Sequence, residues 1–176
     1  DPYDVYRMTT GMGKSMQELL AASVELNVVD GVILPNLKMQ GAEEACAYLD
    51  GEGRCSIHPY RPGICRLFPL GRYYENGGFS YFLQTGECAK ENRSKIKVSK
   101  WIDTPDLTRN QQFTLQWHDL LHAMEERLTG EDEGKQREEN LLLLRLFYLL
   151  PYEGTIDFYT QFTERMEHWN GQNGQI

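Results

Sequence analysis

The chain has 176 residues, of which 40% are hydrophobic and 25% charged, and its net charge at pH 7 is −8. This length allows one domain, or one domain with an extension, around a real hydrophobic core. The acidic balance argues against a nucleic-acid-binding surface, which needs clustered positive charge to neutralise phosphates. We expect the short basic run at residues 93–100 to be a solvated edge.

No segment has the length and apolarity of a transmembrane helix. The longest apolar run, at residues 141–150, is interrupted by Arg145 and has the length of a buried core helix. The chain as given contains no secretory signal, so we expect a cytoplasmic protein that makes no membrane contact.

The first third of the chain is expected to be helical, with one strand at its end. Residues 4–10 are a short helix candidate. The segment Ser15-Met16-Gln17-Glu18 is a capping box that opens a second helix reaching about Asn27, and Gly31 is expected to end it. Residues 32–39 then have the pattern of a strand at the edge of a sheet, since they include Pro35.

The following stretch, residues 41–92, contains the cysteines and is rich in turn signals. Asp50-Gly51-Glu52-Gly53 predicts a turn that places Cys55 on a short strand or hairpin arm. Asn76-Gly77-Gly78 predicts a second turn, inside a hairpin, and Cys88 follows that hairpin in a loop.

From Val98 onward the pattern is helical. An acidic loop at 130–134 and Pro151 are expected to separate three helices, which cover about residues 108–128, 136–150 and 156–169. Thr108 is expected to cap the first of them.

These patterns predict an α+β fold. We expect residues 1–102 to form a cysteine-cluster metal-binding domain built from a cysteine-rich loop and a hairpin that pack against helices. Residues 103–176 are expected to form a helical C-terminal extension packed on that domain.

Four residues combine in a way that ordinary packing does not require: Cys46, Cys55, Cys65 and Cys88. Loops rich in thiols and prolines bury little apolar surface, and a ligated metal or cluster can substitute for a core. Two disulfides are the alternative, although such frameworks belong mostly to short secreted domains. The spacing Cys-x8-Cys-x9-Cys-x22-Cys lacks the CxxC knuckle of common zinc sites, so spacing alone leaves metal binding open.

The residues between the cysteines support a metal site. The segment CSIHPYRPGICRLFPLGR, residues 55–72, resembles the core of the CxxCxxCC-type (YkgJ-type) cysteine-cluster family, a zinc- or iron-chelating domain. PYDVYRM near the start, a strand ending in LKM, YFLQ before Cys88 and VSKWI after it resemble the family in the same order. The resemblance covers about residues 1–102.

The resemblance implies that the four cysteines are ligands of a zinc ion or of an iron–sulfur cluster such as 4Fe–4S, with a redox (oxidoreductase) role as one option. Four thiolates suit one tetrahedral zinc or one cluster equally well. In the family a CxxCC cluster lies shortly before the segment that matches residues 2–7. Two alternatives follow from the resemblance: such cysteines precede Asp1 and the four cysteines are divided between two sites, or this version of the domain works with four cysteines.

Three residues of the same segment are candidates for supporting the metal site. His58 could be a ligand, or a donor to a thiolate, or only a turn residue packed before Pro59. Arg61 and Arg66 flank Cys65, and their guanidinium groups could offset the charge of a thiolate cluster, or instead hold carboxylates and loop carbonyls.

Three functions remain open at this point. The leading one is a cysteine-cluster metalloprotein. The second is a protein methylase resembling flagellin lysine N-methylase, although no GxGxxG turn for a Rossmann-type methyl-donor site follows a strand. The third is a zinc-stabilised module that binds a protein partner without catalysis.

One motif lies outside the resemblance. His118 and His122 occupy positions i and i+4 of a predicted helix, the spacing of the zincin metal pair, with Asp119 in place of the catalytic glutamate. No third ligand is apparent, and we expect an ordinary surface or core-edge helix face.

Overall fold

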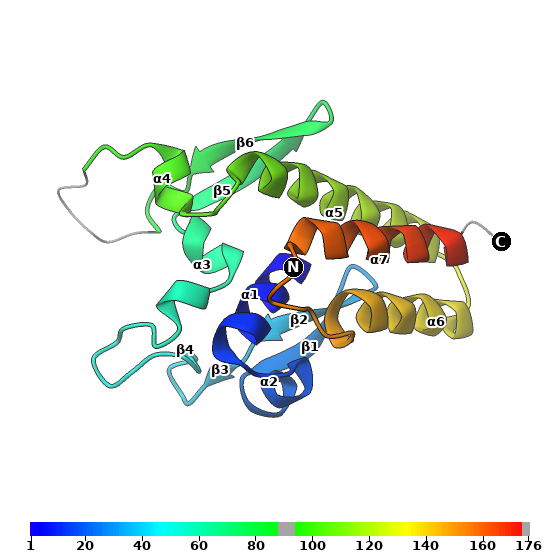
Figure 1. Cartoon of the computed structure of the whole chain (residues 1–176), viewed down its shortest axis with the longest axis horizontal. Helices are drawn as coiled ribbons and strands as arrows, with labels where there is room; N and C mark the ends of the chain where they lie inside the picture. Colours follow the sequence, from blue (N-terminus) through cyan, green and yellow to red (C-terminus); the bar gives the residue numbers. More distant parts are fainter. Residues whose placement is uncertain (88–93, 174–176) are drawn as a thin grey trace. The chain divides into compact units, whose positions relative to one another are not determined.

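The computed structural model describes residues 1–87 and 94–173. Its fold is α+β, as predicted, with helices and small antiparallel sheets (Figure 1). The chain forms two compact units, residues 1–61 with 121–176, and residues 62–120. The predicted division into domains at residue 102 follows sequence pattern rather than contact in space, and it stays a prediction.

The first unit contains α1 (Pro2–Met12), α2 (Met16–Ala22), β1 (Val24–Val29), β2 (Val32–Leu37), β3 (Met39–Gln40), β4 (Ala45–Cys46), the 3-10 turn η1 (His58–Tyr60), α6 (Glu133–Leu144), the π-helical turn η2 (Arg145–Leu149) and α7 (Phe158–Asn173). The second contains α3 (Gly63–Leu67), β5 (Leu70–Glu75), β6 (Gly78–Leu83) and α4 (Val98–Ile102). Helix α5 (Leu107–Leu128) begins in the second unit and ends in the first. Among the described residues, no helix has both the length and the apolarity needed to cross a membrane.

The predicted capping box opens α2. The Glu18 N–H donates to the Ser15 hydroxyl, and the Ser15 N–H donates to the Glu18 carboxylate. The predicted end of this helix near Asn27 is wrong, because the helix stops at Ala22 and residues 24–29 form β1 instead.

The hairpin of β1 and β2 explains that correction. Asp30 and Gly31 have positive φ angles of 50° and 80° and link Val29 directly to its partner Val32. Positive φ at both central residues defines the type I′ turn that suits the twist of a two-residue hairpin. The Asp-Gly pair is therefore a strand-to-strand turn rather than a helix end, and the β-branched valines beside it favour extended backbone.

The second predicted hairpin is confirmed. Asn76 and Gly77, with φ angles of 50° and 71°, connect β5 to β6, and Glu75 pairs with Gly78. The predicted turn at residues 50–53 is also present, and Cys55 forms an isolated antiparallel bridge with Leu49 across it.

Two helix starts differ from the predictions. Helix α5 begins at Leu107, and Asp106 rather than Thr108 accepts a hydrogen bond from its first turn, at 3.3 Å from the Arg109 N–H. The acidic loop is shorter than 130–134, because the Asp132 carboxylate caps α6 by accepting from the N–H of its second and third residues. In both places a carboxylate upstream of the predicted helix start accepts from N–H groups that would otherwise be unpaired.

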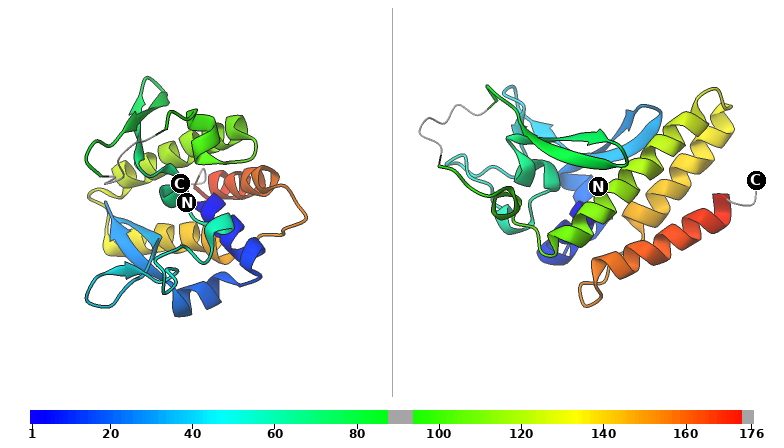
Figure 2. Two further views of the ribbon diagram at one scale, coloured as in Figure 1. Left: turned by 90° about the vertical axis from the view of Figure 1, so that its left-hand side faces the viewer. Right: turned by 90° about the horizontal axis from the view of Figure 1, so that it is seen from above.

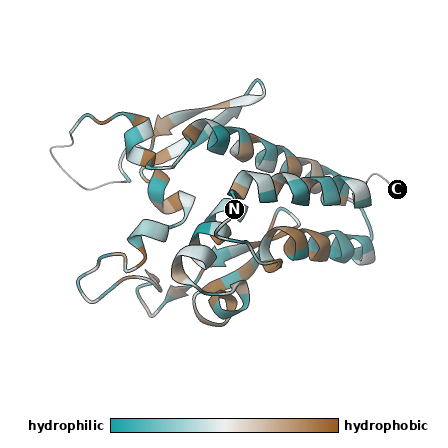
Figure 3. Ribbon diagram, in the orientation of Figure 1, coloured by the Kyte–Doolittle hydropathy of each residue, from teal (hydrophilic) through white to brown (hydrophobic). Residues whose placement is uncertain are grey.

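The core of the first unit is aromatic. Phe158 of α7 lies 5.0 Å from Tyr3 of α1 and 5.9 Å from Phe162, measured between ring centroids, and Phe147 of η2 lies 5.9 Å from Phe162. The apolar run that ends α6 and forms η2 appears brown in Figure 3. Helix α7 and the η2 turn therefore pack against α1.

One buried cation supports this core. Arg165 of α7 is 5% exposed and donates hydrogen bonds to the carbonyl oxygens of Leu146, Leu150 and Pro151, at 2.6, 3.0 and 2.8 Å. Its guanidinium carbon lies 3.6 Å from the ring centroid of Tyr152. Burial lowers the pKa of Arg165 from its ordinary value.

Candidate metal centre

Cys46 lies at the end of a two-strand ladder. Strands β3 and β4 pair so that Met39 faces Cys46, and the connecting turn uses positive φ at Gly41 and Glu44. The Cys46 carbonyl accepts a hydrogen bond from the Leu49 N–H at 3.0 Å. Cys46 is a half-buried free thiol.

Cys55 lies on the next arm along the chain. Its backbone pairs with Leu49, and the following Ser56 donates from both its N–H and its hydroxyl to the Tyr48 carbonyl, at 2.8 and 2.9 Å. Cys55 is also a half-buried free thiol. Leu49 is hydrogen-bonded to the Cys46 carbonyl and forms a β-bridge with Cys55, so the two segments that carry these thiols lie next to each other.

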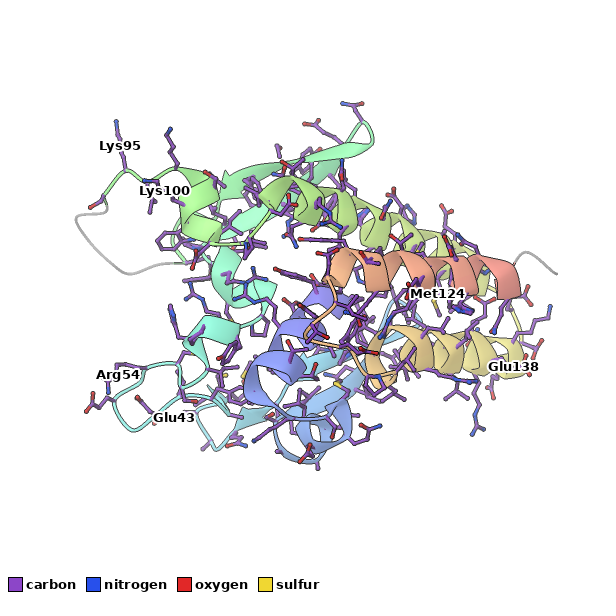
Figure 4. All side chains as sticks on the ribbon, viewed as in Figure 1. Glu43, Arg54, Lys95, Lys100, Met124 and Glu138 are labelled. Atoms are coloured by element: carbon purple, nitrogen blue, oxygen red, sulfur yellow. The ribbon has the colours of Figure 1, made fainter. Side chains whose placement is uncertain are left out.

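The Asp50 turn connects these arms. The Asp50 carboxylate accepts from the N–H groups of Glu52 and Arg54, each at 2.9 Å. Arg54 lies on the outer side of this loop (Figure 4). Hydrogen bonds from the Arg54 and Glu52 backbones hold the pKa of Asp50 below its ordinary value. Because the pKa of Asp50 is lower in the folded state, the ionised carboxylate stabilises the fold at pH values above its ordinary pKa. This stabilisation is lost as the pH falls through the lowered pKa. The contribution of the Asp50 carboxylate to the turn is therefore present at neutral pH.

Helix α1 holds the segment that follows Cys55. Arg7 donates from Nη2 to the Pro59 carbonyl of η1, and the ring of Tyr60 lies over Gly11. The Arg7 Nη1 is buried and has no hydrogen-bond partner among residues 1–87 and 94–173. Sequence reasoning missed Arg7 as a positioning residue, although its segment PYDVYRM is part of the resemblance.

The contact between Gly11 and Tyr60 leaves no room for a side chain at residue 11. We expect Gly11→Ala to destabilise the protein by about 1–3 kcal/mol, because the new Cβ would overlap the Tyr60 ring. At an exposed helix position the same change would stabilise the helix. Urea unfolding of Gly11→Ala, Tyr60→Ala and the double variant measures the coupling. If the loss is the same with and without the Tyr60 ring, the contact does not hold η1.

Cys65 lies on α3, in the second unit, and is half-buried. The short helix begins where the N–H groups of Cys65 and Arg66 donate to the Pro62 carbonyl, at 3.0 and 3.1 Å. Arg66 is 5% exposed and donates from Nη1 to the Thr104 hydroxyl. The Trp101 indole N–H of α4 donates to the carbonyls of Leu67 and Phe68, each at 3.2 Å. These hydrogen bonds connect α4 to the end of α3.

The remaining predicted site residues are placed as follows. His58 opens η1 and is exposed, and Arg61 is half-buried just after that turn. Cys88 lies outside the described residues. Within residues 1–87 and 94–173, no three His, Cys, Asp or Glu side chains gather closely enough to hold a metal ion.

The histidine pair of α5 has other contacts. The His118 ring stacks on the Tyr74 ring of β5, with centroids 3.8 Å apart and an interplanar angle of 11°. Its Nδ1 lies 3.4 Å from the Asp119 carboxylate, and the exposed His122 lies 3.9 Å from that of Glu126. Burial raises the pKa of Tyr74. These contacts are those of a core-edge helix face, as expected.

The donor set fits a thiolate-bound metal in its chemistry. Zinc and iron–sulfur clusters both bind thiolate sulfur, and the thiols of Cys46 and Cys55 are half-buried, free and on adjoining arms.

Comparison with known protein families agrees with this chemistry. Residues 10–96 match the CxxCxxCC family, whose description is "putative zinc- or iron-chelating domain", and this segment includes all four cysteines. No curated protein and no solved structure matches the chain. The match assigns residues 10–96, which are 87 of the 176 residues, to the CxxCxxCC family of putative zinc- or iron-chelating domains.

Proposed function

We propose that the protein chelates a metal centre, either a zinc ion or an iron–sulfur cluster, through the thiolates of Cys46, Cys55, Cys65 and Cys88. The observation that supports this most directly is that very few hydrophobic side chains are buried around Cys46 and Cys55. From Met39 to Arg61, Ile57 alone is a buried hydrophobic residue.

A segment of this kind gains little from burial. Each ordered residue loses about 1–2 kcal/mol of backbone conformational entropy, which one isoleucine cannot offset over the whole segment. Ligand bonds to a metal form only in the folded state, so their free energy adds directly to the stability of the fold. The two half-buried thiols lie where such bonds would stabilise the segment.

The chain's own residues would arrange and activate the ligands. The Asp50 turn fixes the arm of Cys55 relative to that of Cys46, and Arg7 holds the following turn against α1. A thiol must lose its proton to bind a metal, so metal binding is expected to release protons. A bound iron–sulfur cluster would add electron transfer, whereas zinc would supply structure or Lewis acidity.

Metal analysis of protein purified without oxygen tests the proposal. We expect about one zinc ion per chain, or iron with matching acid-labile sulfide and a brown colour. The sulfide assay separates the two centres, and only the iron–sulfur result supports a redox role. Protein with neither metal, and with all four thiols open to a thiol reagent before unfolding, would contradict the proposal.

A further inference from the structure

The β1–β2 hairpin, drawn in blue in Figure 2, is a two-stranded sheet, and its two edges differ. The outer edge of β2 is closed by α6, because the Asn140 side chain accepts from the Ile33 N–H at 2.6 Å and donates to the Gly31 carbonyl at 3.1 Å. Pro35, the next residue whose backbone faces outward on β2, has no N–H to offer. This edge is therefore unable to take another strand.

Within the part of the chain that the structure describes, no second strand pairs with the edge of β1. Lys38 donates to the Ser23 carbonyl at 2.8 Å, so by alternation along the ladder the residues at 25, 27 and 29 exchange hydrogen bonds with β2. The N–H and C=O groups of Leu26 and Val28 consequently point away from β2. The side chains of Leu26 and Val28 are 43% and 69% exposed.

Natural proteins usually protect an open edge with lysine, proline, a bulge or a covering segment. The sequence of β1, VELNVV, contains no lysine or proline, and its ladder to β2 runs without a bulge from Val24 to Val29. Glu25 is the single charged residue of the strand. The edge therefore has the backbone groups and the apolar side chains that a further strand needs.

We propose that β1 pairs antiparallel with β1 of a second copy of this chain, about a two-fold axis at Leu26. In this register Val24 faces Val28 of the second copy, and Glu25 faces Asn27 of the second copy. Two Glu25 carboxylates never meet, so the like-charge repulsion that would oppose self-pairing is absent. The Asn27 amide already donates to Glu25 within one strand, at 3.2 Å, and can donate equally to the facing carboxylate.

The same register continues one apolar face across the axis. Leu26 and Val28 lie on the same face as the buried Val24, since alternate residues of a strand share a face. Pairing removes part of both exposed side chains from water and gives the outward backbone groups partners. The result is a four-stranded antiparallel sheet whose two outer edges are both closed by Asn140.

Sedimentation velocity of the whole chain over a range of concentrations tests the pairing. A reductant is present throughout, because thiol cross-linking would imitate a dimer. We expect a reversible monomer–dimer equilibrium, together with amide hydrogen-exchange protection at Leu26 and Val28 that increases with concentration. A chain that stays monomeric at all concentrations, with unprotected amides at these two positions, would overturn the proposal.

Charge variants at one position test the register. Asn27→Asp places two carboxylates opposite each other twice per dimer and is expected to weaken the dimer about three- to tenfold, whereas Asn27→Lys is expected to strengthen it. Val28→Lys introduces a natural edge-protecting residue and should abolish pairing. Leu141→Lys, at a 53% exposed position of α6, is the matched control and should leave the dimer unchanged. A dimer insensitive to both Asn27 variants and to Val28→Lys uses another surface, and the proposal then fails.

Discussion

Arg165→Met is expected to lower the free energy of unfolding by about 3–5 kcal/mol, among the largest losses that a single substitution causes. The variant leaves the carbonyls of Leu146, Leu150 and Pro151 without the donors that they have now. A buried acceptor that loses its partner costs about 1–3 kcal/mol, and the contact of the cation with the Tyr152 ring is lost as well. Methionine fills a similar volume, so the loss reports on the polar contacts rather than on a cavity.

Urea unfolding followed by circular dichroism measures this effect. Arg165→Lys should recover only part of the stability, because one ammonium group cannot reproduce the planar fork that reaches three carbonyls and lies on the ring. The matched control is Arg109→Met, since the Arg109 side chain is 45% exposed and lies 3.9 Å from Asp106. We expect this control to stay within about 0.5 kcal/mol of the wild type. An Arg165→Met protein as stable as the control would show that α7 does not depend on the cation.

Cys46→Ser and Cys55→Ser are each expected to remove most of the bound metal and to lower the thermal midpoint at the same time. A serine hydroxyl is a far weaker ligand for zinc or iron than a thiolate, and it has nearly the same size as the thiol. Because ligand binding and folding are coupled in a segment with so little core, metal content and stability should fall together. Cys65→Ser and Cys88→Ser should behave in the same way if all four thiols serve one centre.

A chelator separates this effect from simple damage to the loop. The wild-type protein should lose stability when the chelator is added, down to the level of the serine variants, and the variants should not respond further. Glu52→Ser is the matched control, because it introduces the same residue at the tip of the same loop, where the side chain is 71% exposed. A Cys55→Ser protein that keeps its metal and its response to the chelator would exclude Cys55 as a ligand.

The local predictions succeeded where the governing contacts are short in sequence. The capping box of Ser15 and Glu18, the Asp50 turn and the Asn76-Gly77 hairpin each depend on residues within about four positions of one another. The sequence pattern predicts Gly31 as a helix end, because the preceding apolar residues also fit a helical period. In the structure Asp30 and Gly31 instead form a two-residue hairpin turn, which brings Val28 and Val29 into register with β2.

In the candidate site, too, the features that depend on neighbouring residues were predicted and the long-range contacts were not. The residues between the cysteines identified the family from sequence, and the turn signals placed Cys55 on its arm. The role of Arg7 in holding η1 was not visible, because its carbonyl partner at Pro59 is 52 residues away. Likewise, no sequence pattern near Arg66 predicts its hydrogen bond to Thr104, which lies 38 residues further along the chain.

By itself the sequence determined the α+β class, the turns at residues 50–53 and 76–77 and the match of residues 10–96 to a cysteine-cluster family, because these depend on neighbouring residues and on a characteristic order of residue types. The tertiary structure alone decided which buried polar groups find partners. Asn140 closes the edge of β2 and Arg165 satisfies the end of η2 through contacts that span 107 and 15 to 19 residues. Such pairings are set by how packed elements exclude water from each donor and acceptor, and only the folded chain brings them together.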